Sequence, residues 1–231
     1  MRSVGERSTY ETLCQVLGKK LGAWRSFVVA MVAEDVPIEG ERVWVLGGMP
    51  VRCTDVRLLG RGAREEGRTL VVDNGGVGFA GCPAVRLGAH VSIEPLGEGT
   101  TLIGISRDVR QALPAAVAAF EELPVPSEDV CADLLASLPG REALWHATSD
   151  AAQVVAAYLS CHPRVAELRY PGLKKDPSFE VAARTLTGGF GSWVDYRILG
   201  ADSWQRYVAT ADDARVQVLA LEDALAHAGE G

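Results

Sequence analysis

The sequence predicts an α/β protein, with a larger domain built on a partly parallel sheet followed by a smaller α+β domain. In the first half, short β-branched or aromatic runs alternate with segments of helical periodicity, which is the pattern of a parallel sheet covered on both faces. In the second half, Ser192–Leu199 alternates like a strand of a half-exposed antiparallel sheet. The 231 residues, 48% of them apolar, are enough for one large domain or two small ones.

The first predicted element is a helix over Thr9–Leu21. Ser8 or Thr9 is a suitable N-cap, because its hydroxyl can accept a hydrogen bond from the first helical turn. The apolar residues of this segment recur at the spacing of one helix face: Leu13, Val16, Leu17 and Leu21. Phe27–Val32 and Val43–Leu46 follow as predicted strands, since both are short β-branched or aromatic runs bounded by Gly, Pro or charge.

A second helix and a third strand are predicted next. Thr54–Glu66 has helical spacing, with Asp55 near its N-terminus and Gly67 just beyond its end. Thr69–Val72 is an apolar run of strand length. This strand is followed by Asp73, Asn74 and a glycine-rich stretch.

The rest of the larger domain continues the alternation. Ala89–Ile93 and Leu102–Ile105 are predicted strands on either side of a loop over Glu94–Thr100. Asp108–Glu122 is a predicted helix that Pro114 starts or interrupts. The prolines at positions 124 and 126 mark the expected boundary between a domain of residues 1–123 and a domain of residues 124–231.

The smaller domain is predicted to combine helices with an antiparallel sheet. Helical periodicity is found at Glu128–Leu138, Ala147–Ser160 and Pro177–Leu186. Strand patterns are found at Val165–Tyr170, Ser192–Leu199 and Val216–Leu221, the last of which leads into Glu222–His227.

The charge balance argues against nucleic acid as a partner. The net charge is −7, the pI is near 5.2 and no basic stripe is visible, whereas binding to a phosphate backbone requires clustered Lys and Arg. The basic residues are unevenly divided, with nineteen arginines beside only four lysines: Lys19, Lys20, Lys174 and Lys175.

The sequence favours a reduced, cytoplasmic protein without a metal site. Its five cysteines form no CxxC pair and lie in apolar surroundings, which favours buried thiols over a disulfide framework. The start of the chain has no secretory signal, and no apolar run approaches the ~20 residues that a membrane span needs. The four histidines show neither HxxxH nor HxH spacing.

Three stretches carry recognisable motifs. The most specific, HPRVAELRYPGLKKDPSFEVAARTLTGGFGSWVDYRI at His162–Ile198, contains HP, YPGL, DP, A.R and GGFG elements. VWVLGGMP and LVVDN lie between Arg42 and Asn74, and the N-terminal segment reads STYETLCQVLGKKLGA. In this order the motifs resemble the Cys/Met-metabolism family of pyridoxal-phosphate (PLP) enzymes, which includes cystathionine gamma-synthase, cystathionine lyases and methionine gamma-lyase.

The resemblance implies a fold type I PLP-dependent transferase architecture, with a partial parallel-sheet large domain and a small α+β C-terminal domain. It implies PLP as the cofactor, with Asp73 of the VVDN motif paired with the pyridine nitrogen so that the ring acts as an electron sink, and Asn74 beside it in the cofactor site. A purely local role for Asp73, as a cap of the following turn, stays open.

The same resemblance indicates that a catalytic group is missing. The family forms its Schiff base through a lysine in a motif like GAD.vvhSaTKy, and only a primary amine can exchange with the substrate amino group. Here the stretch reads GAHVSIEPLGEG, and counting without gaps from Gly88 places Glu98 in the lysine slot. A carboxylate cannot form an imine and would repel the cofactor phosphate. No lysine occurs between Lys20 and Lys174.

Two more positions depart from the family pattern. Met49 stands where the family has the Asn of an NP pair, which lies near the phenolic oxygen of the cofactor. RVQVLALED resembles the family's R.SvG.ED motif, whose Arg clamps the substrate α-carboxylate, but alignment on Glu222 puts Val216 in the Arg slot and leaves Arg215 one residue out of register. On a strand this slip turns the side chain to the opposite face, although a local bulge would restore it.

The chain begins near the family's YGG segment, so we expect the phosphate-binding glycine loop and its helix to be absent. Together these losses favour a catalytically degenerate relative, a structural or regulatory subunit that forms a homodimer or a heterodimer with a full-length paralogue. The alternative is an active PLP-dependent C–S lyase or transferase on sulfur amino acids, completed by a separate N-terminal polypeptide or a paralogue. A third reading is the product of a decayed or split gene.

Overall fold

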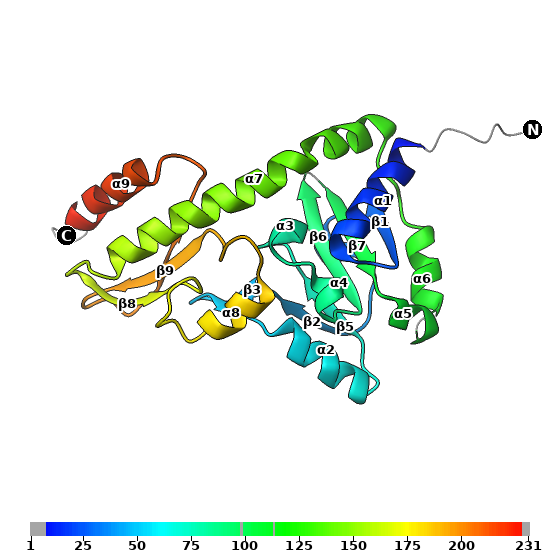
Figure 1. Ribbon diagram of the computed structural model, residues 1–231, viewed down its shortest axis with the longest axis horizontal. Helices are drawn as coiled ribbons and strands as arrows, with labels where there is room; N and C mark the ends of the chain where they lie inside the picture. Colours follow the sequence, from blue (N-terminus) through cyan, green and yellow to red (C-terminus); the bar gives the residue numbers. More distant parts are fainter. Residues whose placement is uncertain (1–7, 98, 113, 228–231) are drawn as a thin grey trace, which may run out of the picture. The chain divides into compact units, whose positions relative to one another are not determined.

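The computed structural model describes residues 8–97, 99–112 and 114–227 (Figure 1). These residues divide into two units. Unit 1 contains residues 8–45 and 55–140, and unit 2 contains residues 46–54 and 141–227. Unit 2 is therefore built from two separate pieces of the chain.

A five-stranded sheet forms the centre of unit 1, in the order β1-β7-β6-β5-β2. Its strands are β1 (Arg25–Val29), β2 (Glu41–Trp44), β5 (Leu70–Asp73), β6 (Val91–Gly97) and β7 (Thr100–Ile105). β2, β5 and β6 run parallel, which confirms the expected parallel sheet for this part. β7 is antiparallel to both β6 and β1, so the sheet as a whole is mixed.

The loop predicted over Glu94–Thr100 is wrong. β6 continues to Gly97 and β7 begins at Thr100, so the two strands form a hairpin. Gly97 and Gly99 have φ values of 130° and 72°, which glycine adopts easily because it has no Cβ atom. The strands can therefore stay paired close to the turn.

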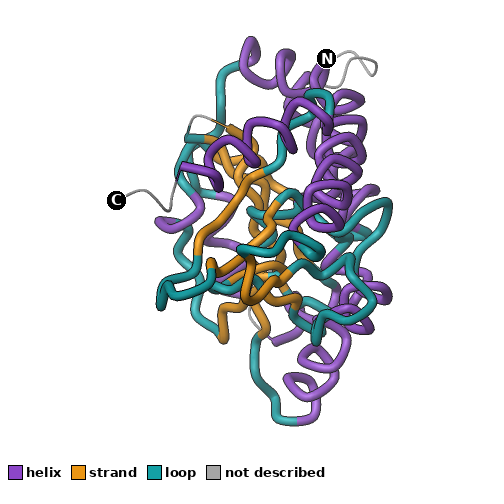
Figure 2. Tube along the Cα trace, turned by 90° about the vertical axis from the view of Figure 1, so that its left-hand side faces the viewer, coloured by secondary structure: helices purple, strands orange, loops and turns teal. Residues whose placement is uncertain are grey.

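Helices cover both faces of this sheet, as the sequence predicted (Figures 1 and 2). One face packs on the short η1 (Ala33–Asp35), α5 (Arg107–Ala112) and α6 (Pro114–Glu121). The other face packs on α1 (Thr9–Leu21), α3 (Gly78–Gly81), α4 (Ala84–Leu87) and the start of α7 (Glu128–Leu159). The two cores alternate along β1, where Phe27 and Val29 face one side and Val28 the other.

Helix boundaries in unit 1 follow the predicted caps. The Ser8 hydroxyl accepts a hydrogen bond from the Glu11 N–H at 3.2 Å and caps α1. Asp55 caps α2 (Val56–Glu65) by accepting the Leu58 N–H at 3.0 Å. Pro114 begins α6, because the first turn of a helix needs no N–H from that residue.

The two helices predicted at Glu128–Leu138 and Ala147–Ser160 are one helix, α7. Pro139 lies inside it and removes one backbone hydrogen bond without ending it. The units divide after Gly140, whereas the sequence placed the boundary between residues 123 and 124. The reason for the difference is that the first turns of α7 belong to the unit 1 core, through Cys131, Leu134 and Leu138.

Unit 2 contains the expected antiparallel sheet, in the order β10-β9-β8. Its strands are β8 (Val165–Arg169), β9 (Trp193–Ile198) and β10 (Gln205–Val208). A hairpin of β3 (Leu46–Gly47) and β4 (Arg52–Cys53) and the helices α8 (Phe179–Thr185) and α9 (Ala214–His227) complete the unit. Val194, Tyr196 and Ile198 of β9 share a core with α7 and α9.

The strand predicted at Val216–Leu221 is wrong, because these residues lie in α9. Gln217, Leu221 and Leu225 are buried at intervals of one helical turn, and the alternation that suggested a strand is coincidental. The Gln217 amide donates hydrogen bonds to the Thr210 and Asp212 carbonyls and fastens the start of the helix.

No helix among the described residues is both long and apolar enough to cross a bilayer. All five cysteines fall within the described ranges, and no disulfide joins them.

The GGFG turn of unit 2 packs directly on α7. A Cβ atom on Gly189 would lie 2.4 Å from the Ser149 Cβ and Oγ atoms, which is far inside contact distance. Trp145 and Ser149 of α7 hold the same turn through hydrogen bonds to the Thr187 carbonyl (2.9 Å) and from the Gly191 N–H (3.1 Å). The motif glycine is therefore needed for close approach of turn and helix.

We predict that Gly189→Ala lowers the free energy of unfolding by about 2 kcal/mol, because the turn must move away from α7. The matched control is Gly140→Ala within α7, where a Cβ atom meets nothing within 4 Å. This control should raise the free energy of unfolding by about 0.5–1 kcal/mol, since Ala is the better helix residue. Urea titrations of both variants test the pair, and equal effects would contradict the prediction.

Candidate functional site

Asp73 and Asn74 lie at the carboxyl end of β5, where parallel sheets place their ligand sites. Asp73 is the last residue of the strand, and Asn74 begins the loop that leads to α3. The Asn74 side chain is fully buried, and its amide donates to the Cys82 carbonyl at 2.9 Å. Asn74 thus fixes the loop, whatever else it does.

The Asp73 carboxylate is engaged by its own chain. Arg42 Nη2, on the neighbouring strand β2, donates to Oδ2 at 2.9 Å, and the Gly75 N–H donates to Oδ1 at 3.0 Å. The same Arg42 nitrogen also donates to the Ala33 carbonyl at 3.2 Å. Asp73 therefore faces a permanent cation, and it also makes the local turn contact that the sequence left open as an alternative.

The loop after β5 is closely filled by side chains of β6. Glu94 is buried, and its Oε1 lies 2.9 Å from where a Cβ atom on Gly78 would be. Pro95 Cδ lies 3.2 Å from the corresponding position at Gly75. Glu94 and Pro95 therefore lie directly against Gly78 and Gly75 of the loop.

The other positions that the family resemblance assigned to the cofactor and substrate sites are not part of the described residues of unit 1. Glu98, which the count places in the lysine slot, lies outside the described residues. Met49 lies in unit 2, in the turn between β3 and β4, and its side chain is exposed.

Arg215, the candidate carboxylate clamp, lies in the exposed first turn of α9. Because this segment is a helix, the argument that a one-residue slip turns the side chain to the other face of a strand does not apply. The Arg215 N–H donates to Asp213 Oδ1 at 2.8 Å as part of the helix start.

Sequence reasoning missed Arg206, which lies on β10 just before α9. The family motif R.SvG.ED has its acidic pair six and seven residues after the Arg. Asp212 and Asp213 stand at that spacing from Arg206, so Arg206 is a second candidate for the clamp position beside Arg215. The signal was present in the sequence, but it requires β10 and α9 to be recognised as separate elements.

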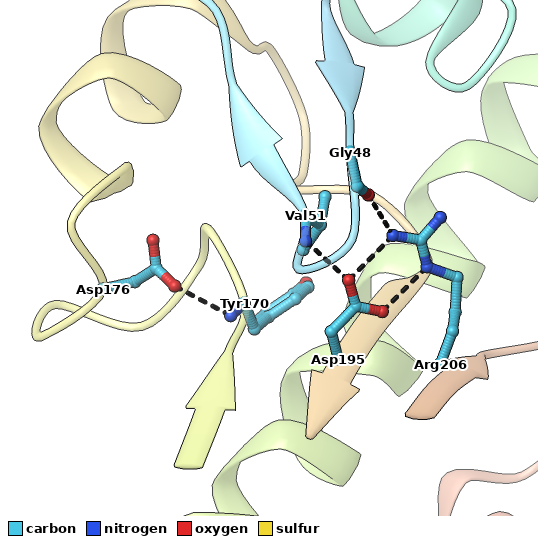
Figure 3. A network of polar contacts seen from close by, with 6 residues as sticks. All are labelled: Gly48, Val51, Tyr170, Asp176, Asp195 and Arg206. Carbon is cyan, nitrogen blue, oxygen red and sulfur yellow. Dashed lines mark hydrogen bonds and ion pairs between the residues drawn. The ribbon is translucent and has the colours of Figure 1, made fainter. Parts of the chain in front are cut away.

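Arg206 makes a two-point ion pair with Asp195, the residue directly opposite on β9 (Figure 3). Nε donates to Oδ1 and Nη2 donates to Oδ2, both at 2.7 Å. The Asp195 side chain is 0% exposed, and that of Arg206 is 23% exposed. Hydrogen bonding to Asp195 raises the pKa of Arg206 above its ordinary value.

Two contacts join this pair to the β3–β4 hairpin (Figure 3). The Val51 N–H donates to Asp195 Oδ2 at 2.5 Å, and Arg206 Nη2 donates to the Gly48 carbonyl at 2.5 Å. The guanidinium also lies over the Trp193 ring, 4.5 Å from its centroid. The Nε–Nη2 edge of Arg206 is therefore occupied by the chain itself.

The YPGL and DP motifs have structural roles in unit 2 (Figure 3). Asp176 accepts the Tyr170 N–H at 2.9 Å and the Ser178 N–H at 2.7 Å, which closes the turn before α8. The Tyr170 hydroxyl is buried near the Ser149 and Gly191 carbonyls, at 3.1 and 3.2 Å, and burial raises its pKa above the ordinary value. Within the part of the chain that the structure describes, no three His, Cys, Asp or Glu side chains are placed to hold a metal ion.

A helix-covered mixed sheet together with a small antiparallel α+β unit gives this protein the fold of type I PLP-dependent enzymes. Among solved structures, the chain is similar to an apo methionine gamma-lyase from Micromonospora echinospora, with a TM-score of 0.76, 18% identity, and coverage of 96% of this chain and 86% of that one. A structure from the same organism, described as a cystathionine gamma-lyase, has a TM-score of 0.77 and 17% identity, with coverage of 96% of this chain and 87% of that one.

A third similar structure is cystathionine gamma-synthase from Xanthomonas oryzae pv. oryzae in complex with aminoacrylate and cysteine, with a TM-score of 0.75, 15% identity, and coverage of 94% and 85%. The family model of Cys/Met metabolism PLP-dependent enzymes matches residues 45–221. The chain therefore belongs to the Cys/Met metabolism family of PLP-dependent enzymes. No curated protein matches the sequence.

The family depends on PLP, and the residues of this chain do not fit a covalently held PLP. There is no primary amine on any side chain from residue 21 to residue 173. Asp73, which would meet the pyridine nitrogen, is already paired with the Arg42 guanidinium. The buried Glu94 side chain lies against Gly78 at the end of the loop that follows.

We predict that Arg42 and Asp73 are energetically coupled. A double-mutant cycle with Arg42→Met and Asp73→Asn should give a coupling free energy of about 1–2 kcal/mol, because the pair is largely buried. The control cycle is Arg64→Met with Asp108→Asn, an exposed pair at 3.0 Å that should give less than about 0.5 kcal/mol. Chemical denaturation measures both cycles, and a coupling at Arg42–Asp73 no larger than the control would refute the assignment.

Proposed function

We propose that this chain is a non-catalytic member of its family, acting as a structural or regulatory subunit. The proposal rests on one contact in the structure together with one feature of the sequence. The carboxylate that would hold the pyridinium is paired with Arg42, and no lysine exists between Lys20 and Lys174 to form the Schiff base. Without an amine at the family's lysine position there is no imine exchange there, and the family's chemistry begins with that exchange.

The state of Arg206 supports the same proposal from unit 2. Arg206 stands at the motif spacing of the residue that clamps the substrate carboxylate in the family. Its guanidinium is already used by Asp195 and the Gly48 carbonyl. A substrate carboxylate would have to displace a buried carboxylate of the chain itself, which costs more than filling an open site.

A subunit role requires a partner, and we propose a second copy of the chain or a full-length paralogue in the cytoplasm. Large apolar side chains are exposed on α9, namely Val216 and Leu219, and these are candidate contacts for that partner. The absence of disulfides among the five cysteines is consistent with a reducing compartment.

One observation favours the alternative, an active PLP-dependent C–S lyase or transferase on sulfur amino acids, completed by a separate N-terminal polypeptide or a paralogue. Lys20 Nζ lies 5.5 Å from the ring centroid of Phe79, and Phe79 is on α3, which follows the loop of Asp73 and Asn74. Lys20 is the lysine that this contact would make the first candidate for the Schiff base in an active form.

We expect the purified chain, incubated with an equimolar amount of PLP, to show no imine absorbance in the visible region. Borohydride reduction followed by peptide mass spectrometry should find no pyridoxyl adduct on Lys19, Lys20, Lys174 or Lys175. A stoichiometric adduct on any of the four would contradict the proposal. Lys20→Arg is the matched variant, since an adduct that disappears with this change would establish the alternative.

We also expect the chain to form a dimer alone or with a full-length relative. Light scattering should then give twice the chain mass of 24.6 kDa for the protein alone, or the summed mass for a mixture with the paralogue. The mass of a single chain under both conditions would exclude the subunit role.

A further inference from the structure

We propose that unit 2 contains a carboxylate-binding site that the chain fills with its own Asp195. The site consists of two donors on one edge of Arg206, Nε and Nη2, and of the Val51 N–H, all directed at a single carboxylate. Its ligand class is a small carboxylate such as formate or acetate. In the native chain Asp195 acts as a tethered ligand that closes the site.

The geometry is that of a receptor and its ligand. Three donors reach the two Asp195 oxygens at 2.7, 2.7 and 2.5 Å, and they come from two different elements, β10 and the β3–β4 hairpin. The fork of Arg206 meets the carboxylate in the two-point arrangement that is typical of carboxylate recognition. No part of the Asp195 side chain is exposed, so solvent does not share in holding it.

The Arg206 side of the site is held independently of Asp195. The guanidinium stacks on the Trp193 ring and donates to the Gly48 carbonyl. Val51 is fully buried in its hairpin, which orients its N–H. Arg206 and the Val51 N–H should therefore keep their positions when the Asp195 carboxylate is removed by substitution.

The inference rests on the proposed function and deepens it, because a carboxylate site occupied by Asp195 accords with a chain that binds no substrate. Its test is nevertheless separate. Failure of the PLP experiment would leave the carboxylate site untouched, and failure of the experiment below would leave the missing amine untouched.

The experiment restores the missing carboxylate from solution. Asp195→Ala removes one carboxylate group, which formate matches in size, and it should lower Tm on the order of 10 °C by leaving Arg206 buried without its anion. Sodium formate rising to about 0.3 M should recover about 5 °C of this loss in a saturating manner, because the anion binds only the folded state. Sodium chloride at the same ionic strength should not.

Size selectivity provides the sharper readout. Asp195→Gly removes a whole acetate unit, so this variant should be stabilised more by acetate than by formate, whereas Asp195→Ala should respond more to formate. Wild-type protein should show no specific response to either salt. In Asp195→Ala/Arg206→Met both charges are gone, so this variant should fold without an anion and show no rescue.

Each outcome bears on the proposal. Specific, saturating rescue that requires Arg206 would establish the site. Rescue of equal size in the double variant, or none in the single variants, would overturn it. If Asp195→Ala does not fold in buffer, its refolding yield is measured with and without formate. The proposal is also overturned if the double variant folds while formate fails to refold the single variant.

Discussion

Unit 2 depends on one interaction, the cross-strand pair of Asp195 and Arg206. β9 and β10 are short, and the β3–β4 hairpin arrives from a distant part of the sequence, yet all three meet at a single buried carboxylate. Breaking a buried pair by removing one partner typically costs 3–5 kcal/mol, against total stabilities of about 5–15 kcal/mol. The apolar core on the other face of β9 supplies the hydrophobic stabilisation of the unit, whereas the ion pair joins β9, β10 and the hairpin.

Unit 1 uses its charges in a related way. At the carboxyl end of β5, where parallel sheets bind ligands, Asp73 is satisfied by Arg42 and by the backbone of Gly75. In the proposed function, both ion pairs use groups that would otherwise be available to bound molecules. A member of a PLP-dependent family can in this way keep the family's fold while its charged residues bind each other and not a ligand.

Local sequence rules predicted the parts of the fold that local physics decides. Ser8 and Asp55 cap their helices as expected, and the parallel strands β2, β5 and β6 follow from buried β-branched runs. The same rules failed where tertiary contacts decide. Pro139 does not end α7. Val216–Leu221, which lies in α9, was predicted as a strand because the buried face of this helix includes the polar Gln217 and so lacks an apolar helical pattern.

The candidate site shows the same division. Asp73 was found because VVDN is a local motif, but its partner Arg42 is on another strand, and no local pattern links the two. Arg206 was missed because the alignment was anchored on Glu222, and the choice between Glu222 and Asp212 depends on where β10 ends and α9 begins. Asp195 was simply one residue of a strand until the register placed it opposite Arg206.

The division of unit 2 into two pieces of chain has a consequence for biosynthesis. Val51 leaves the ribosome long before Asp195, which lies 144 residues later. At about 5–20 residues per second, the β3–β4 hairpin waits roughly 7–30 s for the strands that complete its unit. During that interval residues 55–140 of unit 1 are synthesised, so the hairpin must stay soluble without the strands that later bury Val51.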